Sequence, residues 1–261
     1  MKAVVLQENL AKALSIVSRS VASKATVPVL GNVLLRESKG GLEVAGTNLE
    51  VGVRLMVPGN VEKGFEITVP ARMVTEMISD LGPGQVEMEE SEGKLKVAAG
   101  KFKAELAGIA GAEFPVIPVA AGEATMVVMK EEWVKQLTKV VFAAATDEGR
   151  PVLTGVLFEG ADGGMVVVAT DGYRLSKAEI KNQKSKIKSD VDKLLIPARA
   201  VGELLRLAGE SEGEEVKVWV TAEANQVIFK LGETELVSRL IEGAFPDYQK
   251  IIPGRGETRV E

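Results

Sequence analysis

Hydrophobic positions repeat along the chain with two different periods. Near the N-terminus, Leu10, Ala13, Leu14 and Val17 have the i, i+3, i+4, i+7 spacing of one helix face. The same spacing, with lysines on the opposite side, returns much later in Trp133, Leu137, Val140, Val141 and Ala144. The pattern therefore predicts an amphipathic helix near residue 10 and another near residue 137.

A second pair of helices is predicted by two further apolar stripes. One runs through Val74, Met77, Ile78 and Leu81, and the other through Val201, Leu204, Leu205 and Ala208. A proline precedes each stripe, at Pro70 and Pro197, as is common at helix starts. Gly82 and Gly209 follow the stripes, where we expect left-handed caps.

Between the helices the period changes to two, which is typical of strands. Residues 94–99 and 101–106 alternate around Gly100, and segments 216–220, 226–231 and 234–240 form a meander with a Gly–Glu turn. Helices with one apolar face must pack on one side of such antiparallel sheets. The expected fold class is therefore α+β.

The chain repeats itself. VLGNVL at 29–34 matches VLTGVL at 152–157, and VPARMVTEMI at 69–78 matches IPARAVGELL at 196–205, in the same order and at offsets of 123 and 127. Such ordered blocks indicate a tandem duplication. We predict a first domain over 1–120, a second over 125–250, and over 251–261 a linker with the opening strand of a third unit.

Composition narrows the possible functions. The 261 residues carry a net charge of −5 and include neither cysteine nor histidine. Disulfides, thiolate metal sites and the most common general base are thereby excluded. No close Asp/Glu cluster in a glycine-rich loop would hold a metal ion, and neither an export signal nor a membrane span is visible. We expect no metal, no cofactor, no membrane contact and a cytoplasmic location.

Two other functional classes have some support in the sequence. Asp171, Tyr173 and Arg174 could serve an enzyme as acid, donor and anion clamp, but strand neighbours point to opposite faces and no phosphate loop or nucleophile elbow is present. A sequence-specific DNA-binding module would need a helix with an Arg, Asn or Gln cluster to read base edges, and none is found. Neither class fits well.

Four ordered segments carry a family resemblance: TVPVLGNVLL (26–35), TDGYRL (170–175), PARAV (197–201) and AFPDY (244–248). In these the chain resembles the bacterial DNA polymerase III β subunit family, the sliding clamps. The resemblance implies domains of two helices on antiparallel sheets, joined head to tail into a ring around duplex DNA. It implies a processivity factor rather than an enzyme. Family subunits have three such domains, so we expect a truncated two-domain fragment; the alternative is a natural two-domain clamp that closes as a trimer.

A ring that slides on DNA would contact phosphates without reading bases. Cations on the predicted helix faces, together with positions where the family is basic, give the candidates. They are Lys12, Arg19, Lys24, Arg72, Lys135, Lys139, Arg150, Arg199 and Arg206. Their helix faces are expected to be basic, except for the second helix of the first repeat, where Glu76 and Asp80 make the polar face mixed to acidic.

The resemblance also implies a hydrophobic cleft, between the second and third domains, for an extended client peptide with Leu and Phe anchors. Carried over position by position, the cleft would use Leu153, Thr170, Gly172, Tyr173, Arg174, Leu175, Pro246, Lys250 and Ile251. Tyr173 and Lys250 depart from the residues common in the family. Without the resemblance, residues 170–175 favour a strand that ends in a tight Asp–Gly turn, with the leucine in the core.

The partners implied are duplex DNA, bound topologically and without sequence preference, the polymerase III α subunit and the clamp loader δ subunit. Other implied clients are repair polymerases, mismatch-repair proteins and ligase. Ring self-association would use an edge strand near Lys103, Ala104 and Leu106 and the helix around Met77 and Ile78. An edge strand without a partner invites association.

Overall fold

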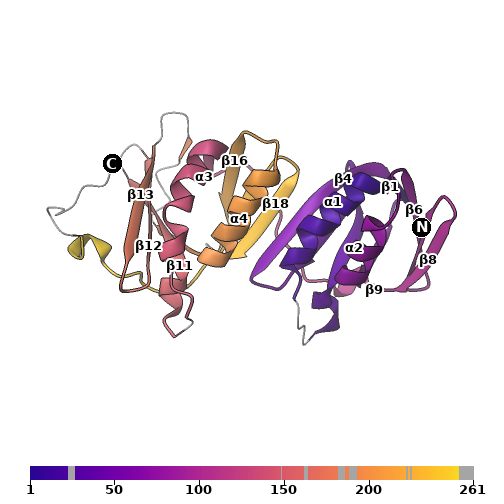
Figure 1. Cartoon of the computed structure of the whole chain (residues 1–261), viewed down its shortest axis with the longest axis horizontal. Helices are drawn as coiled ribbons and strands as arrows, with labels where there is room; N and C mark the ends of the chain where they lie inside the picture. Colours follow the sequence, from indigo (N-terminus) through magenta and orange to yellow (C-terminus); the bar gives the residue numbers. More distant parts are fainter. Residues whose placement is uncertain are drawn as a thin grey trace.

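Two similar units lie side by side, and one sheet passes through both (Figure 1). The structure is a computed structural model that describes residues 1–22, 27–147, 149–161, 164–181, 186–187, 193–221, 223 and 225–252. The four α-helices of the described residues lie on the same side of the molecule, in front of the strands in Figure 1. This arrangement confirms the α+β class and the packing of helices on one side of antiparallel sheets.

The first unit contains two helices, α1 (Gln7–Val17) and α2 (Ala71–Ser79). Short 3-10 turns lie at η1 (Ser18–Ser20), η2 (Pro28–Gly31) and η3 (Gly111–Glu113). Its strands are β1 (Lys2–Leu6), β2 (Asn32–Ser38), β3 (Gly41–Thr47), β4 (Val51–Val61), β5 (Glu66–Pro70), β6 (Gln85–Ser91), β7 (Lys94–Ala99), β8 (Phe102–Ala107) and β9 (Ile109–Ala110).

The second unit repeats this order with helices α3 (Lys130–Thr138) and α4 (Ala198–Glu210). Its 3-10 turns are η4 (Val141–Ala143), η5 (Pro151–Thr154) and η6 (Tyr248–Lys250). Its strands are β10 (Met126–Met129), β11 (Gly155–Ala161), β12 (Gly164–Thr170), β13 (Leu175–Lys181), β14 (Lys186–Ile187), β15 (Lys193–Pro197), β16 (Glu215–Val220), β17 (Gln226–Leu231) and β18 (Thr234–Arg239).

The junction between the units is a pair of antiparallel strands. The longer sheet runs in the order β14-β10-β16-β17-β18-β4-β1-β6-β7-β8, so that β18 of the second unit pairs directly with β4 of the first. A smaller sheet, in the order β13-β12-β11-β15, belongs to the second unit alone. Because backbone hydrogen bonds fix the junction, the two units are held in one register rather than tethered only by a linker.

The helix stripes pack as their periodicity predicts. Leu10, Leu14 and Val17 are fully buried in the main core, as are Trp133 and Leu137 at the equivalent positions of α3. Trp133 stacks on Phe158 with 5.7 Å between ring centroids. Among the described residues, no helix combines the length and the apolar character needed to cross a membrane.

Two local predictions are wrong. The stripe of the third predicted helix extends to Ala144, but α3 ends at Thr138, and Val140 and Ala144 reach the core from either side of η4. Gly82 and Gly209 do not adopt left-handed conformations, because α2 ends at Ser79 on a right-handed cap and α4 continues through Gly209. The Gly100 and Gly232 turns of the hairpins are confirmed, both with positive φ.

A buried ion pair crosses the junction on the strands themselves. Arg54 of β4 lies opposite Glu235 of β18, and its Nε donates to Glu235 Oε2 at 2.9 Å while Nη2 bonds the same oxygen. Lys230 approaches the other carboxylate oxygen at 3.3 Å. Both members of the pair are almost fully buried. A charge left alone in such a place is strongly destabilising, so the pair makes the junction specific for this register.

Replacing Glu235 by alanine should therefore lower the free energy of unfolding by about 3–5 kcal/mol, because Arg54 would remain buried without its carboxylate. Equilibrium urea unfolding of the purified chain would measure this. Glu233→Ala, in the exposed turn of the same hairpin, is the matched control and should change little. Equal effects of the two substitutions would contradict the role given to the ion pair.

Candidate nucleic-acid and peptide interfaces

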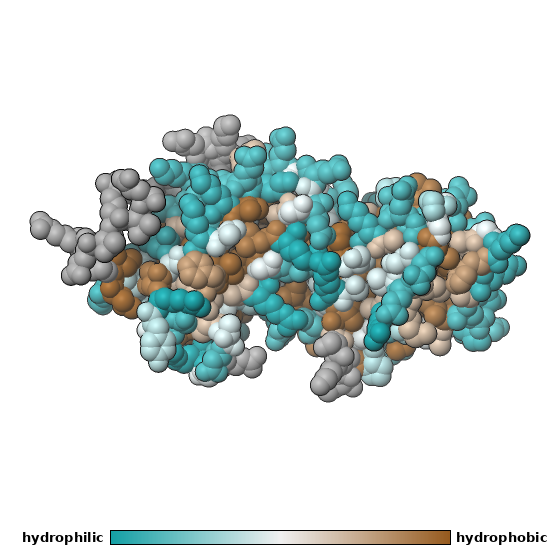
Figure 2. All heavy atoms as spheres, in the orientation of Figure 1, coloured by the Kyte–Doolittle hydropathy of each residue, from teal (hydrophilic) through white to brown (hydrophobic). Residues whose placement is uncertain are grey.

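Most of the predicted DNA-facing cations lie on the side of the molecule that the helices cover. Lys12 is on α1, Arg72 on α2, Lys135 on α3, and Arg199 and Arg206 on α4. Arg19 follows α1 and Lys139 follows α3. Figure 2 shows that hydrophilic side chains dominate this face, with apolar patches between them. Lys24 falls outside the described residues.

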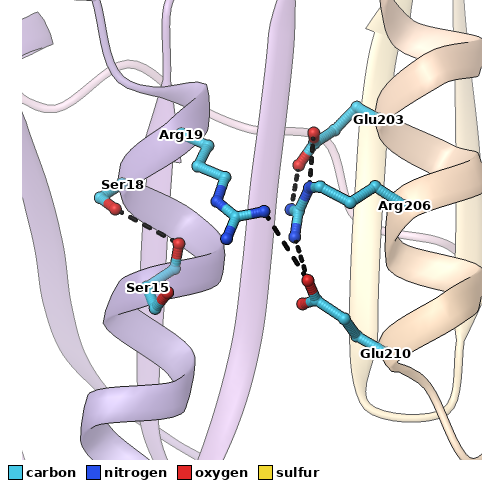
Figure 3. A network of polar contacts seen from close by, with 6 residues as sticks. All are labelled: Ser15, Ser18, Arg19, Glu203, Arg206 and Glu210. Atoms are coloured by element: carbon cyan, nitrogen blue, oxygen red, sulfur yellow. Dashed lines mark hydrogen bonds and ion pairs between the residues drawn. The ribbon is translucent and has the colours of Figure 1, made fainter.

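Ion pairs reduce the basic character of this face. Arg206 bonds Glu203 and Glu210 on its own helix, and Arg19 reaches Glu210 across the junction at 3.7 Å (Figure 3). Glu203 first, and then Glu210, raise the pKa of Arg206, because a hydrogen-bonded carboxylate favours the charged guanidinium. On α4, carboxylates one helical turn away therefore compensate Arg206, whereas Arg199 on the same helix has no ion-pair partner among the described residues.

The same pairing occurs on α2. Arg72 donates its Nε–H to Glu76 Oε1 at 2.8 Å, four residues along the helix, in a fully solvated position. Such an exposed pair adds little stability. It places an acidic group beside the cation, so α2 presents no net positive charge from this pair, in line with the mixed polar face expected there.

Four candidate cations keep their charge available. Lys12, Lys135, Lys139 and Arg199 are exposed, and none forms an ion pair with another residue in the described ranges. Lys139 does donate to the amide oxygen of Gln136 at 3.3 Å, which leaves its charge uncompensated. These four side chains are the part of the predicted set best suited to phosphate contacts.

Arg150 was predicted to face DNA, but its guanidinium contacts the turn at residues 170–175. Its Nη2 donates to the carbonyl oxygen of Asp171 at 3.0 Å. A Cβ added to Gly172 would lie only 3.0 Å from Nη1, and Gly172 has φ +95°. The guanidinium thus rests on the turn that the peptide-site prediction includes, and glycine permits both the turn and this approach.

That turn, residues 170–175, is held by its own polar groups. Asp171 Oδ1 accepts the backbone N–H groups of Tyr173 and Arg174, both at 2.9 Å. Thr170 Oγ1 donates to the Arg174 carbonyl at 2.7 Å and accepts the Gly172 N–H at 3.0 Å. The two N–H donors lower the pKa of Asp171. Asp171 therefore acts as a turn former held in its charged state, which is unlike a proton-donating catalytic acid.

Around the turn, the predicted peptide residues differ in accessibility. Tyr173 is 97% exposed, whereas Leu153 is only 3% exposed and Thr170 is buried. The Arg174 guanidinium lies 5.6 Å from the ring centroid of Phe142, a mostly exposed aromatic residue that the sequence prediction did not include. Leu153 can therefore support an apolar wall from beneath, but its own surface is not open to a ligand.

The turn and the C-terminal segment meet in one small apolar cluster. Leu175 packs there with Val152, Ile241 and Phe245 around a buried group formed by Leu157, Val166, Val168, Leu195 and Tyr248. The half-buried Pro246 lies beside this cluster in sequence. The fold thus brings the β12–β13 turn and residues 245–248 together, as the predicted peptide site requires. Lys250 and Ile251 follow at an exposed position.

A polar contact secures the C-terminal segment. Tyr248 donates its hydroxyl to Glu159 Oε2 at 2.7 Å, and Lys193 lies 2.9 Å from the other carboxylate oxygen. Lys193 and Tyr248, in that order, lower the pKa of Glu159. Burial, and then Glu159, raise the pKa of Tyr248. Lys250 pairs similarly with Asp247 at 2.8 Å, but in solvent.

A cavity of about 720 Å³ opens between this segment and strands β11 and β15. Its lining includes Leu157, Glu159, Leu195, Ile241 and Phe245. Of the nine predicted peptide residues, Pro246 alone lines it, so the cavity was missed by sequence reasoning. In the sequence, Leu157 and Glu159 share one face of β11. This spacing indicates a face that is partly polar, but it does not indicate a cavity. In the described part of the chain, no group of three acidic side chains is placed to hold a metal ion.

The Glu159 contact should make docking of the C-terminal segment depend on pH. Because the folded pKa of Glu159 is lowered, its contribution is full above the unfolded value of about 4.3 and is lost as pH falls through the folded value. Glu159→Gln should remove that dependence and cost about 1 kcal/mol at neutral pH. Urea midpoints measured from pH 3 to pH 7 would test this. An unchanged pH profile in the variant would contradict it.

Models of two domains match the chain in turn. The DNA polymerase III β subunit N-terminal domain matches residues 1–118, and the central domain of the same subunit matches residues 128–247. A beta sliding clamp from Synechocystis is 33% identical over 97% of this chain and 69% of its own length. One from Pseudomonas aeruginosa is 32% identical, with 97% and 68% covered.

Solved structures agree with these matches. The DNA polymerase sliding clamp of Bacillus subtilis superposes with a TM-score of 0.90 at 25% identity, over 98% of this chain and 68% of that one. A Pseudomonas aeruginosa sliding clamp, DNA polymerase III subunit beta, bound to griselimycin gives 0.88 at 30% identity, over 98% and 69%. The chain thus spans about two thirds of the relatives it matches.

Proposed function

This chain belongs to the bacterial beta sliding clamp family, the β subunit of DNA polymerase III, and from this we propose that its two units form consecutive segments of a ring around duplex DNA. Members of this family are processivity factors of replication and not enzymes. The observation that carries the proposal is the β4–β18 junction, which joins the units through one sheet and keeps all four helices on the same side. Repeating that junction with further domains would close a ring whose helices share one surface.

On this proposal the helix surface faces the DNA. The exposed cations Lys12, Lys135, Lys139 and Arg199 would contact phosphates, while Arg19, Arg72 and Arg206 keep their carboxylate partners. Arg150 would support the peptide turn instead, and Lys24 stays a prediction. Few and long cations hold DNA weakly, which suits a ring that must slide and that reads no sequence. Encirclement then supplies the lasting attachment.

Salt dependence would test the assignment of the cations. At low salt the chain should bind linear duplex DNA weakly and without sequence preference. Lys135→Gln should reduce the slope of log affinity against log salt by about 0.9, because one phosphate contact is lost. Arg72→Gln is the control and should change the slope less, since Glu76 already compensates that arginine. Equal changes in both variants would contradict the assignment.

We further propose that client proteins dock an extended peptide at the β12–β13 turn and residues 245–251. Support comes from the shared cluster of Leu175 and Phe245, from the exposed Tyr173 and Ile251, and from Arg174 held over Phe142. Apolar anchors beside a few oriented polar groups are typical of peptide sites. The equivalent stretch of the first unit, TNLEVG at 47–52, has none of Gly172, Tyr173 and Arg174, so only the second copy is specialised.

Ile251→Asp should weaken binding of a fluorescent peptide with Leu and Phe anchors by about tenfold or more, because it places a charge at an apolar anchor. Fluorescence anisotropy would measure the change in Kd. Val116→Asp, on a side chain that is 95% exposed in the other part of the chain, is the matched control and should bind like the unchanged protein. Absence of saturable binding by the unchanged protein would count against this site.

Family membership implies that DNA and a polymerase are the general partners and that the subunits form a ring. We propose the polymerase III α subunit and the clamp loader δ subunit as the principal clients of the peptide site, with repair polymerases, mismatch-repair proteins and ligase as others. We also infer domain limits near 1–120 and 125–250. Of the predicted self-association surface, β8 presents Lys103 and Ala104 at an edge, but Ile78 is fully buried and cannot contribute to it. The predicted strand after residue 252 lies outside the described residues.

A further inference from the structure

Several described strands have one edge without a partner strand, and two of these edges matter here. One belongs to β8, at one end of the longer sheet, and the other to β13, at one end of the smaller sheet. Edges of this kind expose a row of backbone donors and acceptors that another strand can complete. If copies of this chain joined head to tail, these two edges would have to meet.

Because the two units are copies, each of these edge strands corresponds to one of the two strands of the internal junction, β4 or β18. In the first unit Gly46 pairs with Val53, and in the second Ala169 pairs with Ser176, so β13 corresponds to β4 at the offset of 123. The hairpin turns give the other correspondence. Phe102 follows the Gly100 turn as Thr234 follows the Gly232 turn, so β8 corresponds to β18. A second copy docking as the units do would therefore pair β13 with β8.

This register brings two like charges together. At the internal junction Arg54 lies opposite Glu235. The corresponding residues are Lys177 on β13 and Lys103 on β8, so that the basic partner is kept and the acidic one is replaced by a lysine. Like charges directly opposite on neighbouring strands are destabilising. The acidic Glu235 of the internal junction thus has the basic Lys103 as its counterpart on β8.

Nearby carboxylates do not relieve this conflict. Glu105 is bound to Lys94 at 2.7 Å, and Glu179 to Lys177 itself at 3.3 Å. In the transferred register both would lie diagonally across from the opposing lysine, farther away than the directly facing pair. Lys103 has no ion-pair partner within the described ranges, so no carboxylate compensates its charge.

A second contact of the internal junction is also absent from the outer edges. Arg19 reaches Glu210 across the junction and links the two helix pairs (Figure 3). At the offsets of the duplication, Arg19 corresponds to Phe142 and Glu210 to Pro83. Neither can form an ion pair. Two independent positions, one on strands and one beside helices, thus separate the outer edges from the internal junction.

We infer that Lys103 and Lys177 prevent copies of this chain from pairing head to tail, and that each outer edge selects a partner strand with an acidic residue at the facing position. The inference rests on the strand-paired ring of the proposed function and adds to it a rule for which edges combine. A second copy of this chain could pair with the backbone hydrogen-bonding groups of the edge, but it would place Lys177 opposite Lys103. The partner of β8 is instead a strand that presents Asp or Glu opposite Lys103.

Charge reversal would test the rule by sedimentation velocity over a concentration series. The unchanged chain should sediment as the 27.7 kDa monomer. Lys103→Glu should associate at least about tenfold more strongly, because it faces Lys177 with the opposite sign. The double variant Lys103→Glu/Lys177→Glu restores like charges and should return to the monomer.

Lys101→Glu is the matched control, with the same charge change in the same hairpin. In the transferred register Lys101 faces Glu179, so this substitution should not promote association. The inference is overturned if Lys103→Glu remains monomeric, if the double variant associates as strongly as the single one, or if the unchanged chain already associates through these edges. Peptide and DNA binding by the same variants should be unaltered, so a failure here is distinguishable from a failure of the proposed function.

Discussion

The shared edge between β4 and β18 is the constraint on which the rest of the structure depends. Each strand would otherwise expose a row of backbone hydrogen-bonding groups. Pairing them makes one sheet of two units, and it fixes on which side of that sheet the helices lie. The buried Arg54–Glu235 pair then restricts the register, because any slip would separate the two charges inside the protein. The helix surface that spans both units takes its arrangement from this junction.

Charge on the helix surface is balanced rather than simply basic. The chain is acidic overall, and three of its candidate arginines have carboxylate partners within ion-pair distance. Glu210 serves two of them, Arg206 on its own helix and Arg19 on the other unit, so it also ties the units together (Figure 3). A protein that must hold DNA without stopping on it benefits from a few unpaired cations more than from a uniformly positive wall.

The two copies of the repeat have diverged in use. The second copy carries a turn held by Asp171 and Thr170, which positions Arg174 over Phe142 and Leu175 against the C-terminal segment. The tight turn that the residues alone favoured therefore forms part of the proposed peptide site. Its rigidity comes from local hydrogen bonds, and its apolar surroundings come from several separate segments, from Val152 to Tyr248.

The sequence by itself determined the two helix pairs, the hairpins, the duplication and the family, because apolar spacing and turn chemistry depend on neighbours in the chain. Only the tertiary structure decided which charges meet. Arg54 and Glu235 are 181 positions apart, and no local pattern marks them as partners. It likewise placed Arg150 on the Gly172 turn, paired Arg19 with Glu210 and buried Leu153. These outcomes follow from which strand edges join, and that depends on the whole backbone rather than on any one segment.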